Sequence, residues 1–174
     1  MTVAAGVFVT ILERYYRVAG TSSRHLMEAA MMMAPRRASA QHVGYTDWQI
    51  GWSFTPRETE RRHVVGAARV EVVVTRTLPR WRPPAAADRA LVSSWNELVA
   101  AIARHEQGHV DIVVSGARSL QEAVVRVAPS ELRADLDWKV VAVTESALAA
   151  VRAADLDYDV ATRHGALQGV CLPW

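Results

Sequence analysis

The feature that most constrains the fold is a long stretch of apolar residues at helical spacing, over residues 89–127. Most of them are three or four positions from the next, as on one face of an amphipathic helix: Leu91, Trp95, Leu98, Ile102, Ile112, Leu120, Val124 and Val127. The stretch is long for one globular helix. We therefore expect the helix to begin near Ser94, where Glu97 completes a capping box, and to end or kink at Gly116.

The residues before this stretch predict strands and one short helix. Apolar residues alternate over residues 44–54 and 69–78, which indicates two half-buried, antiparallel strands joined by a charged surface loop at 55–63. Residues 11–18 are rich in β-branched and aromatic side chains and predict another strand. A short helix is expected over Ser23–Met33, with Thr21 and Ser22 as possible N-caps.

The C-terminal part predicts a second long helix, from a cap at Ser130 to about residue 154. Residues 155–174 contain two glycines and a proline and are expected to be irregular. The pattern as a whole predicts an α+β fold, in which a small, mostly antiparallel sheet packs on two long C-terminal helices. At 174 residues, the chain has the length of one domain, residues 1–174.

The composition narrows the kinds of partner. The net charge of +2 is too small to indicate a nucleic-acid partner, and no apolar run is long enough to predict a membrane span. The single cysteine, Cys171, excludes an internal disulfide and a metal site built from several thiolates. A metal site in this chain would therefore use nitrogen and oxygen ligands.

The sequence HEQGH, at residues 105–109, lies inside the long helical stretch. His105 and His109 are four residues apart and so share one helix face, where both can bind one metal ion. Glu106 lies beside that face and can accept a proton from water, so the pattern predicts a catalytic Zn²⁺ site with Glu106 as general base. The alternative is a pair of hydrogen-bonded core histidines. Gly108 predicts that another backbone passes close to the helix.

A catalytic zinc needs a third protein ligand, which must come from another part of the chain. The candidates are Glu145, Asp155, Asp157, Asp159 and His164. We favour His164, because Gly165 permits a tight turn that presents the ring, with Glu145 or Asp159 as alternatives; Asp159 is also a possible orienting partner of His164. Tyr158 offers a phenol that can stabilise an oxyanion, although a tyrosine here can also serve only packing.

Five segments in a fixed order resemble one bacterial family: YYRVAG, GYTDWQIGW, a valine-rich strand ending in LPRW, HEQGHV, and YDVATRHGALQG. The chain resembles the bacterial family of unknown function number 922, described as predicted secreted zinc-dependent proteases, from about residue 15 to residue 173. The resemblance implies a zincin-like fold, with a sheet flanking the active-site helix, and favours His164 over Glu145 as the third ligand.

The family resemblance also implies a periplasmic or secreted location. Residues 3–12 are apolar but lack a preceding positive region, so we interpret them as the first strand or the remainder of a longer precursor rather than a cleavable signal. No feature indicates an oligomeric state.

We therefore expect a zinc-dependent peptidase, with His105, His109 and His164 as ligands, Glu106 as general base and Tyr158 at the oxyanion. Its substrate is expected to be an extended peptide or protein segment, held on an exposed strand edge within residues 69–78. The alternative is a non-catalytic metal-binding or protein-interaction domain on the same scaffold.

Overall fold

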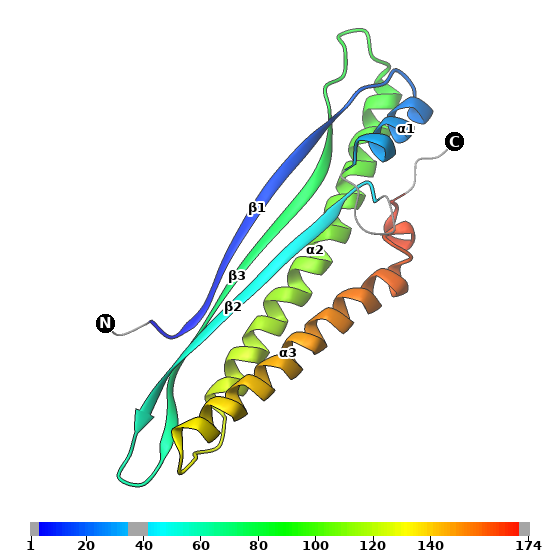
Figure 1. The fold of residues 1–174 in the computed structure, drawn as a ribbon. Helices are drawn as coiled ribbons and strands as arrows, with labels where there is room; N and C mark the ends of the chain where they lie inside the picture. The colour runs from blue at the N-terminus through cyan, green and yellow to red at the C-terminus, as the bar shows by residue number, and fades with distance from the viewer. Residues whose placement is uncertain (1–3, 35–41, 171–174) are drawn as a thin grey trace. The chain divides into compact units, whose positions relative to one another are not determined.

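The computed structural model describes residues 4–34 and 42–170 and has an α+β fold (Figure 1). Its three strands form one small mixed sheet in the order β1-β3-β2: β2 and β3 are antiparallel, whereas β1 runs in the same direction as β3. The elements are β1 (Gly6–Val18), α1 (Ser23–Met33), β2 (Tyr45–Glu58), β3 (His63–Trp81), α2 (Arg89–Val125), α3 (Arg133–Thr162) and the short 3₁₀ helix η1 (Ala166–Gln168).

The chain divides into two compact units, each assembled from three stretches. The first unit comprises Met1–Thr10, Trp48–Val74 and Asp111–Leu156, and the second comprises Ile11–Asp47, Thr75–Val110 and Asp157–Trp174. Each strand and each of the two long helices therefore contributes a segment to both units. The single domain expected from the chain length stays a prediction.

The core of the second unit joins β1, α1, β3 and α2. Eight of its buried residues form one apolar cluster: Val18, Leu26, Ala30, Leu78, Trp81, Trp95, Leu98 and Ile102. The Trp81 and Trp95 rings meet edge to face, with their centroids 6.0 Å apart. The side chain of Ser22 accepts a hydrogen bond from the backbone N–H of His25, which confirms the predicted cap and bounds of α1.

In the first unit, β3 buries alternate residues, as its sequence predicts. Val70, Val72 and Val74 are buried and alternate with the more exposed side chains between them. The predicted β2 face is half-buried as well, and consists of Trp48, Ile50, Trp52 and Phe54. The apolar side chains that α2 and α3 bury in this unit include Val113, Ala117, Leu120, Val124, Leu136 and Val140.

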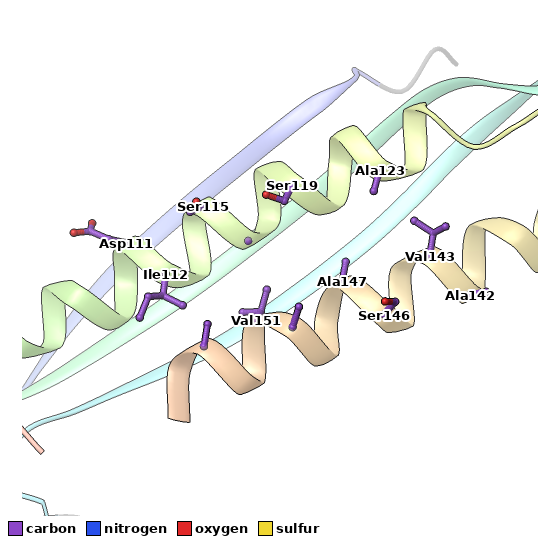
Figure 2. Close-up of a pocket in the computed structure, with 13 residues that line it drawn as sticks. Asp111, Ile112, Ser115, Ser119, Ala123, Ala142, Val143, Ser146, Ala147 and Val151 are labelled. Atoms are coloured by element: carbon purple, nitrogen blue, oxygen red, sulfur yellow. The ribbon is translucent and has the colours of Figure 1, made fainter. Parts of the chain in front are cut away.

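An apolar groove of about 860 Å³ lies between α2 and α3 within the first unit (Figure 2). A methyl group at Gly116 would overlap the Val151 side chain, so this glycine permits the close contact of the two helices. Gly116 is therefore a packing residue and does not end α2, which continues to Val125. Asp111 is the one ionisable residue that lines the groove, which consequently offers no set of metal ligands.

Several predicted boundaries are wrong. α2 begins at Arg89 rather than near Ser94. The Asp88 side chain accepts a hydrogen bond from the backbone N–H of Ala90, which has no partner within the helix, and so provides an earlier cap. Ser130 does not cap α3. Its backbone pairs with His63 and its hydroxyl accepts a hydrogen bond from Lys139.

The loop predicted over residues 55–63 is also too long, since β2 continues to Glu58 and β3 begins at His63. β3 is the central strand, and both its edges are paired, so the free strand edge predicted within residues 69–78 is wrong. The outer strands β1 and β2 carry the open edges of the described sheet.

α3 continues to Thr162, eight residues beyond the predicted end at about residue 154. Tyr158 and Asp159 therefore lie on a helix instead of in an irregular segment. None of the helices in the described residues combines the length and the apolar composition that a membrane crossing requires.

Candidate metal centre

His105 and His109 lie on α2, in the part of this helix that belongs to the second unit. Their residues are only 6% and 7% exposed, and their Nε2 atoms are 3.4 Å apart. Ile102 and Val110 are apolar residues of the same helix and are buried. Because these two side chains pack into the core, the helix also directs His105 and His109 inward. One helix face thus presents two imidazole nitrogens to the same point.

Asp159 completes a group of three possible ligands. It lies in the last turn of α3, and its Oδ1 atom is 3.2 Å from the Nε2 atoms of both His105 and His109. The three ligand atoms lie within 4.8 Å of one another, and no other such group occurs among the described residues. Two imidazole nitrogens and one carboxylate oxygen form a donor set that fits a catalytic zinc with an open fourth position.

The electrostatics of the group favour an ionised carboxylate beside the two rings. Burial raises the pKa of Asp159, but the hydrogen bonds from His105 and His109 outweigh it and hold this pKa well below its ordinary value. Burial lowers the pKa of His105, whereas its hydrogen bonds to Asp159 and Gln168 raise it, and the net shift is upward. The site therefore attracts positive charge, either as a proton on His105 or as a metal cation.

Glu106 is buried beside this group, with 2% of its surface exposed. The hydroxyl of Thr46 donates a hydrogen bond to its Oε2 atom at 2.7 Å. Burial raises the pKa of Glu106, partly offset by the Thr46 hydrogen bond and by the neighbouring histidines. A carboxylate whose pKa is raised is a stronger base than an exposed glutamate, as proton abstraction from water requires.

The chain just before β2 covers Glu106. A methyl group at Gly44 would overlap the side chain of Ile102, and it would lie 3.0 Å from Oε1 of Glu106. The Tyr16 hydroxyl holds this segment in place, because it donates a hydrogen bond to the backbone carbonyl of Val43 at 2.5 Å. Glycine is therefore required at residue 44 for the chain to pass this close to α2.

Tyr158 packs against both histidine rings. Its ring stacks on His105, with centroids 5.2 Å apart and an interplanar angle of 13°, and meets His109 edge to face at 4.9 Å. A methyl group at Gly108 would overlap the Tyr158 hydroxyl and ring. Gly108 does mark a close approach to the helix, as predicted, but the approaching group is the Tyr158 side chain and not a backbone.

His164 lies beside the group of three but is not part of it. Its Nδ1 atom is 3.5 Å from Oδ1 of Asp159, its ring centroid is 4.9 Å from that of His42, and its side chain is 56% exposed. The backbone at His164 is left-handed, with φ of 52°, as at Arg163 with φ of 50°, so the chain adopts an unfavourable conformation here. His164 as the third ligand stays a prediction.

The remaining candidates for the third ligand lie elsewhere. Glu145 is exposed, and Asp155 accepts a hydrogen bond from the Trp48 indole at 3.1 Å; these three residues belong to the first unit. Asp157 is in the second unit, where it is exposed. Of the alternatives left open by the sequence, the structure brings Asp159 together with His105 and His109.

Two residues of the site carry no recognisable signal in the sequence. Thr46 contacts Glu106 from a position 60 residues away, and Gln168 contacts His105 from 63 residues away. Neither threonine nor glutamine is part of the His-Glu-x-x-His pattern of metal ligands and base. Gln168 nevertheless falls within the segment YDVATRHGALQG, which we singled out for its resemblance to a family.

Comparisons with curated proteins and with solved structures gave no match. A family model described as "Bacterial protein of unknown function (DUF922)" matches residues 13–165. This range includes Glu106 and the whole group of His105, His109 and Asp159. Since the match extends over most of the chain, the protein belongs to this family, Bacterial protein of unknown function (DUF922).

Proposed function

We propose that the protein is a zinc-dependent peptidase with a zincin-like arrangement of sheet and active-site helix. The observation that carries the proposal is the convergence of His105, His109 and Asp159, whose ligand atoms lie within 4.8 Å of one another. Glu106 lies directly after the first histidine and is buried beside the second. A zinc ion and a general base are the two components that metal-assisted hydrolysis needs.

In this proposal His105, His109 and Asp159 hold the zinc, and the fourth position is left to water or substrate. When bound, zinc polarises the carbonyl of the scissile bond and makes water a stronger nucleophile near neutral pH. The support for Asp159 is its short distance, 3.2 Å, to both imidazole nitrogens. His164 is more exposed, and its Nδ1 atom is 3.5 Å from Oδ1 of Asp159.

Glu106 supplies the proton transfers of the reaction. Its carboxylate accepts one proton from the attacking water, whose oxygen forms a bond to the carbonyl carbon of the peptide. Glu106 then gives this proton to the amine nitrogen as the carbon–nitrogen bond breaks, so that the products are a carboxylic acid and an amine. Thr46 holds Glu106 in a fixed position, because its hydroxyl donates to Oε2 at 2.7 Å.

The open edge of β2 supports a peptide as substrate. β2 is an outer strand, and Thr46 is its second residue. The Thr46 hydroxyl lies within hydrogen-bonding distance of both the carboxylate and the backbone carbonyl of Glu106. An extended peptide can pair with such an edge through main-chain hydrogen bonds. The outer edge of β2 near Thr46 therefore replaces residues 69–78 as our proposed binding edge.

The test compares two glutamine substitutions on the same helix. Glu106→Gln removes the general base and keeps the zinc ligands, whereas Glu122→Gln changes an exposed glutamate of α2 that pairs with Arg126. The zinc content of each protein is measured by inductively coupled plasma mass spectrometry. Cleavage is measured by mass spectrometry of a peptide library incubated with the protein. We expect both variants to bind zinc, and only Glu106→Gln to lose hydrolysis.

Two outcomes would overturn the proposal. The first is hydrolysis by Glu106→Gln at the wild-type rate. The second is wild-type protein that binds zinc and cleaves no peptide in the library, which is the behaviour of a non-catalytic metal-binding domain.

A further inference from the structure

Gln168 contacts the metal centre from the short helix η1. Its Oε1 atom is 2.9 Å from Nδ1 of His105, and its Nε2 atom donates a hydrogen bond to the Tyr158 hydroxyl at 2.9 Å. Tyr158 in turn stacks on the His105 ring. These three side chains therefore form a closed set of contacts, in which Gln168 is at Nδ1 of His105 while Asp159 is at the other ring nitrogen.

These contacts determine which nitrogen of His105 can bind a metal. An amide oxygen can only accept a hydrogen bond, so Nδ1 of His105 must carry the proton. When the ring is neutral, the lone pair then lies on Nε2, the nitrogen that is 3.2 Å from Asp159 and 3.4 Å from Nε2 of His109. In the metal-free protein a second proton on Nε2 makes the hydrogen bond to Asp159, and a bound metal ion would take the place of that proton. In the opposite tautomer, Nε2 would carry the proton and could not bind a metal.

The backbone around Gln168 is built closely against His105. Gly165 has φ of 81°, and a methyl group there would lie 3.0 Å from Cγ of His105 and 2.6 Å from the Val170 side chain. The backbone N–H of Gln168 donates to the carbonyl of Gly165 at 2.8 Å, which fixes the start of the amide side chain. Glycine at residue 165 is required both for its backbone conformation and for this approach.

We propose that Gln168 is a positioning residue, which selects the metal-binding tautomer of His105 while the Tyr158 hydroxyl fixes the orientation of its amide. The inference rests on the proposed function, because it assigns a role toward the zinc of that site. Hydrogen-bond partners of metal-binding histidines fix the ring and raise the basicity of the ligand.

The test measures zinc affinity without any peptidase assay. Gln168→Met removes the hydrogen-bond acceptor and keeps a side chain of similar size, whereas Gln168→Glu keeps an acceptor oxygen. The control is Gln121→Met, the same glutamine-to-methionine substitution on α2 in the first unit. The Kd for Zn²⁺ is measured by competition with a chelator. We expect Gln168→Met to bind zinc about 10- to 100-fold more weakly than wild type. Gln168→Glu and Gln121→Met should stay near the wild-type Kd.

A second readout separates positioning from general destabilisation. Nitrogen-15 NMR of the metal-free protein, above the pKa of His105, should show a larger fraction of the tautomer with the proton on Nδ1 in wild type than in Gln168→Met, because Asp159 accepts at Nε2 in both proteins. If Gln168→Met does not fold, Tyr158→Phe replaces it. This variant removes the oxygen that accepts from the amide, and we expect a smaller loss of zinc affinity.

An unchanged Kd and an unchanged tautomer in the folded variants would overturn the role of Gln168, while peptide cleavage by the same protein would leave the peptidase proposal intact. Conversely, weaker zinc binding by Gln168→Met in a protein that cleaves no peptide would support the role of Gln168 and contradict the peptidase proposal.

Discussion

Replacing Gly108 by alanine should weaken zinc binding, although residue 108 is not a ligand. In a helix interior, alanine alone would stabilise the fold by about 1 kcal/mol relative to glycine. In this structure the new methyl group would overlap the hydroxyl and ring of Tyr158, and such overpacking costs about 1–3 kcal/mol. We therefore expect the free energy of unfolding of the metal-free protein to fall by about 0–2 kcal/mol.

The larger effect should be on the metal. Tyr158 cannot move from Gly108 without disturbing its stacking on His105 and its hydrogen bonds to Gln168. The loss of a ligand's supporting contacts lowers metal affinity by about 10- to 100-fold. Zinc affinity is measured by chelator competition, and the free energy of unfolding by chemical denaturation.

Gly116→Ala is the matched control. Its methyl group would overlap Val151 on the same pair of helices but in the first unit, so it should destabilise the protein and leave zinc affinity unchanged. In a Tyr158→Ala background the overlap is gone, and Gly108→Ala should then stabilise the fold by about 1 kcal/mol. Unchanged zinc affinity in Gly108→Ala, or an equal loss in Gly116→Ala, would refute the reasoning.

Asp159→Ala should lower zinc affinity by at least about 100-fold, and His164→Ala by much less, in the same competition assay; the reverse order would make His164 the ligand. Thr46→Val removes a hydrogen bond that lowers the pKa of Glu106, so the acid limb of the pH–rate profile should move to higher pH. An unmoved limb would contradict this assignment. Finally, protons compete with zinc for His105, whose pKa is raised above 6.5. Calorimetry at several pH values should therefore show binding that weakens as the pH falls, from above 6.5 downward, whereas constant affinity down to pH 5 would contradict it.

The sequence predicts well the features that depend on local pattern. The hydroxyl of Ser22 precedes a short apolar-periodic segment, and α1 begins at the next residue. The alternation of Val70, Val72 and Val74 determines which face of β3 is buried. Such signals operate over one or two turns of helix or a few residues of strand, and the structure agrees with them.

The errors concern features that depend on distant packing. Gly116 looks like a helix end because glycine is unfavourable in a helix, but the contact with Val151, 35 residues away, gives it a packing role inside α2. Asp159 lies close to a glycine-rich turn and was not expected on a helix, although α3 continues past it. Its place in the candidate site follows from that helix, since α3 presents Tyr158 and Asp159 together to the histidines of α2.

The central claim is that one zinc ion lies between His105, His109 and Asp159. It is tested most directly by crystallising the zinc-loaded protein and locating the metal by anomalous diffraction at the zinc absorption edge. The account predicts one strong peak about 2.0–2.2 Å from the two imidazole Nε2 atoms and from Oδ1 of Asp159. A zinc ion bound elsewhere, or bound to the histidines with Asp159 out of reach, would contradict it.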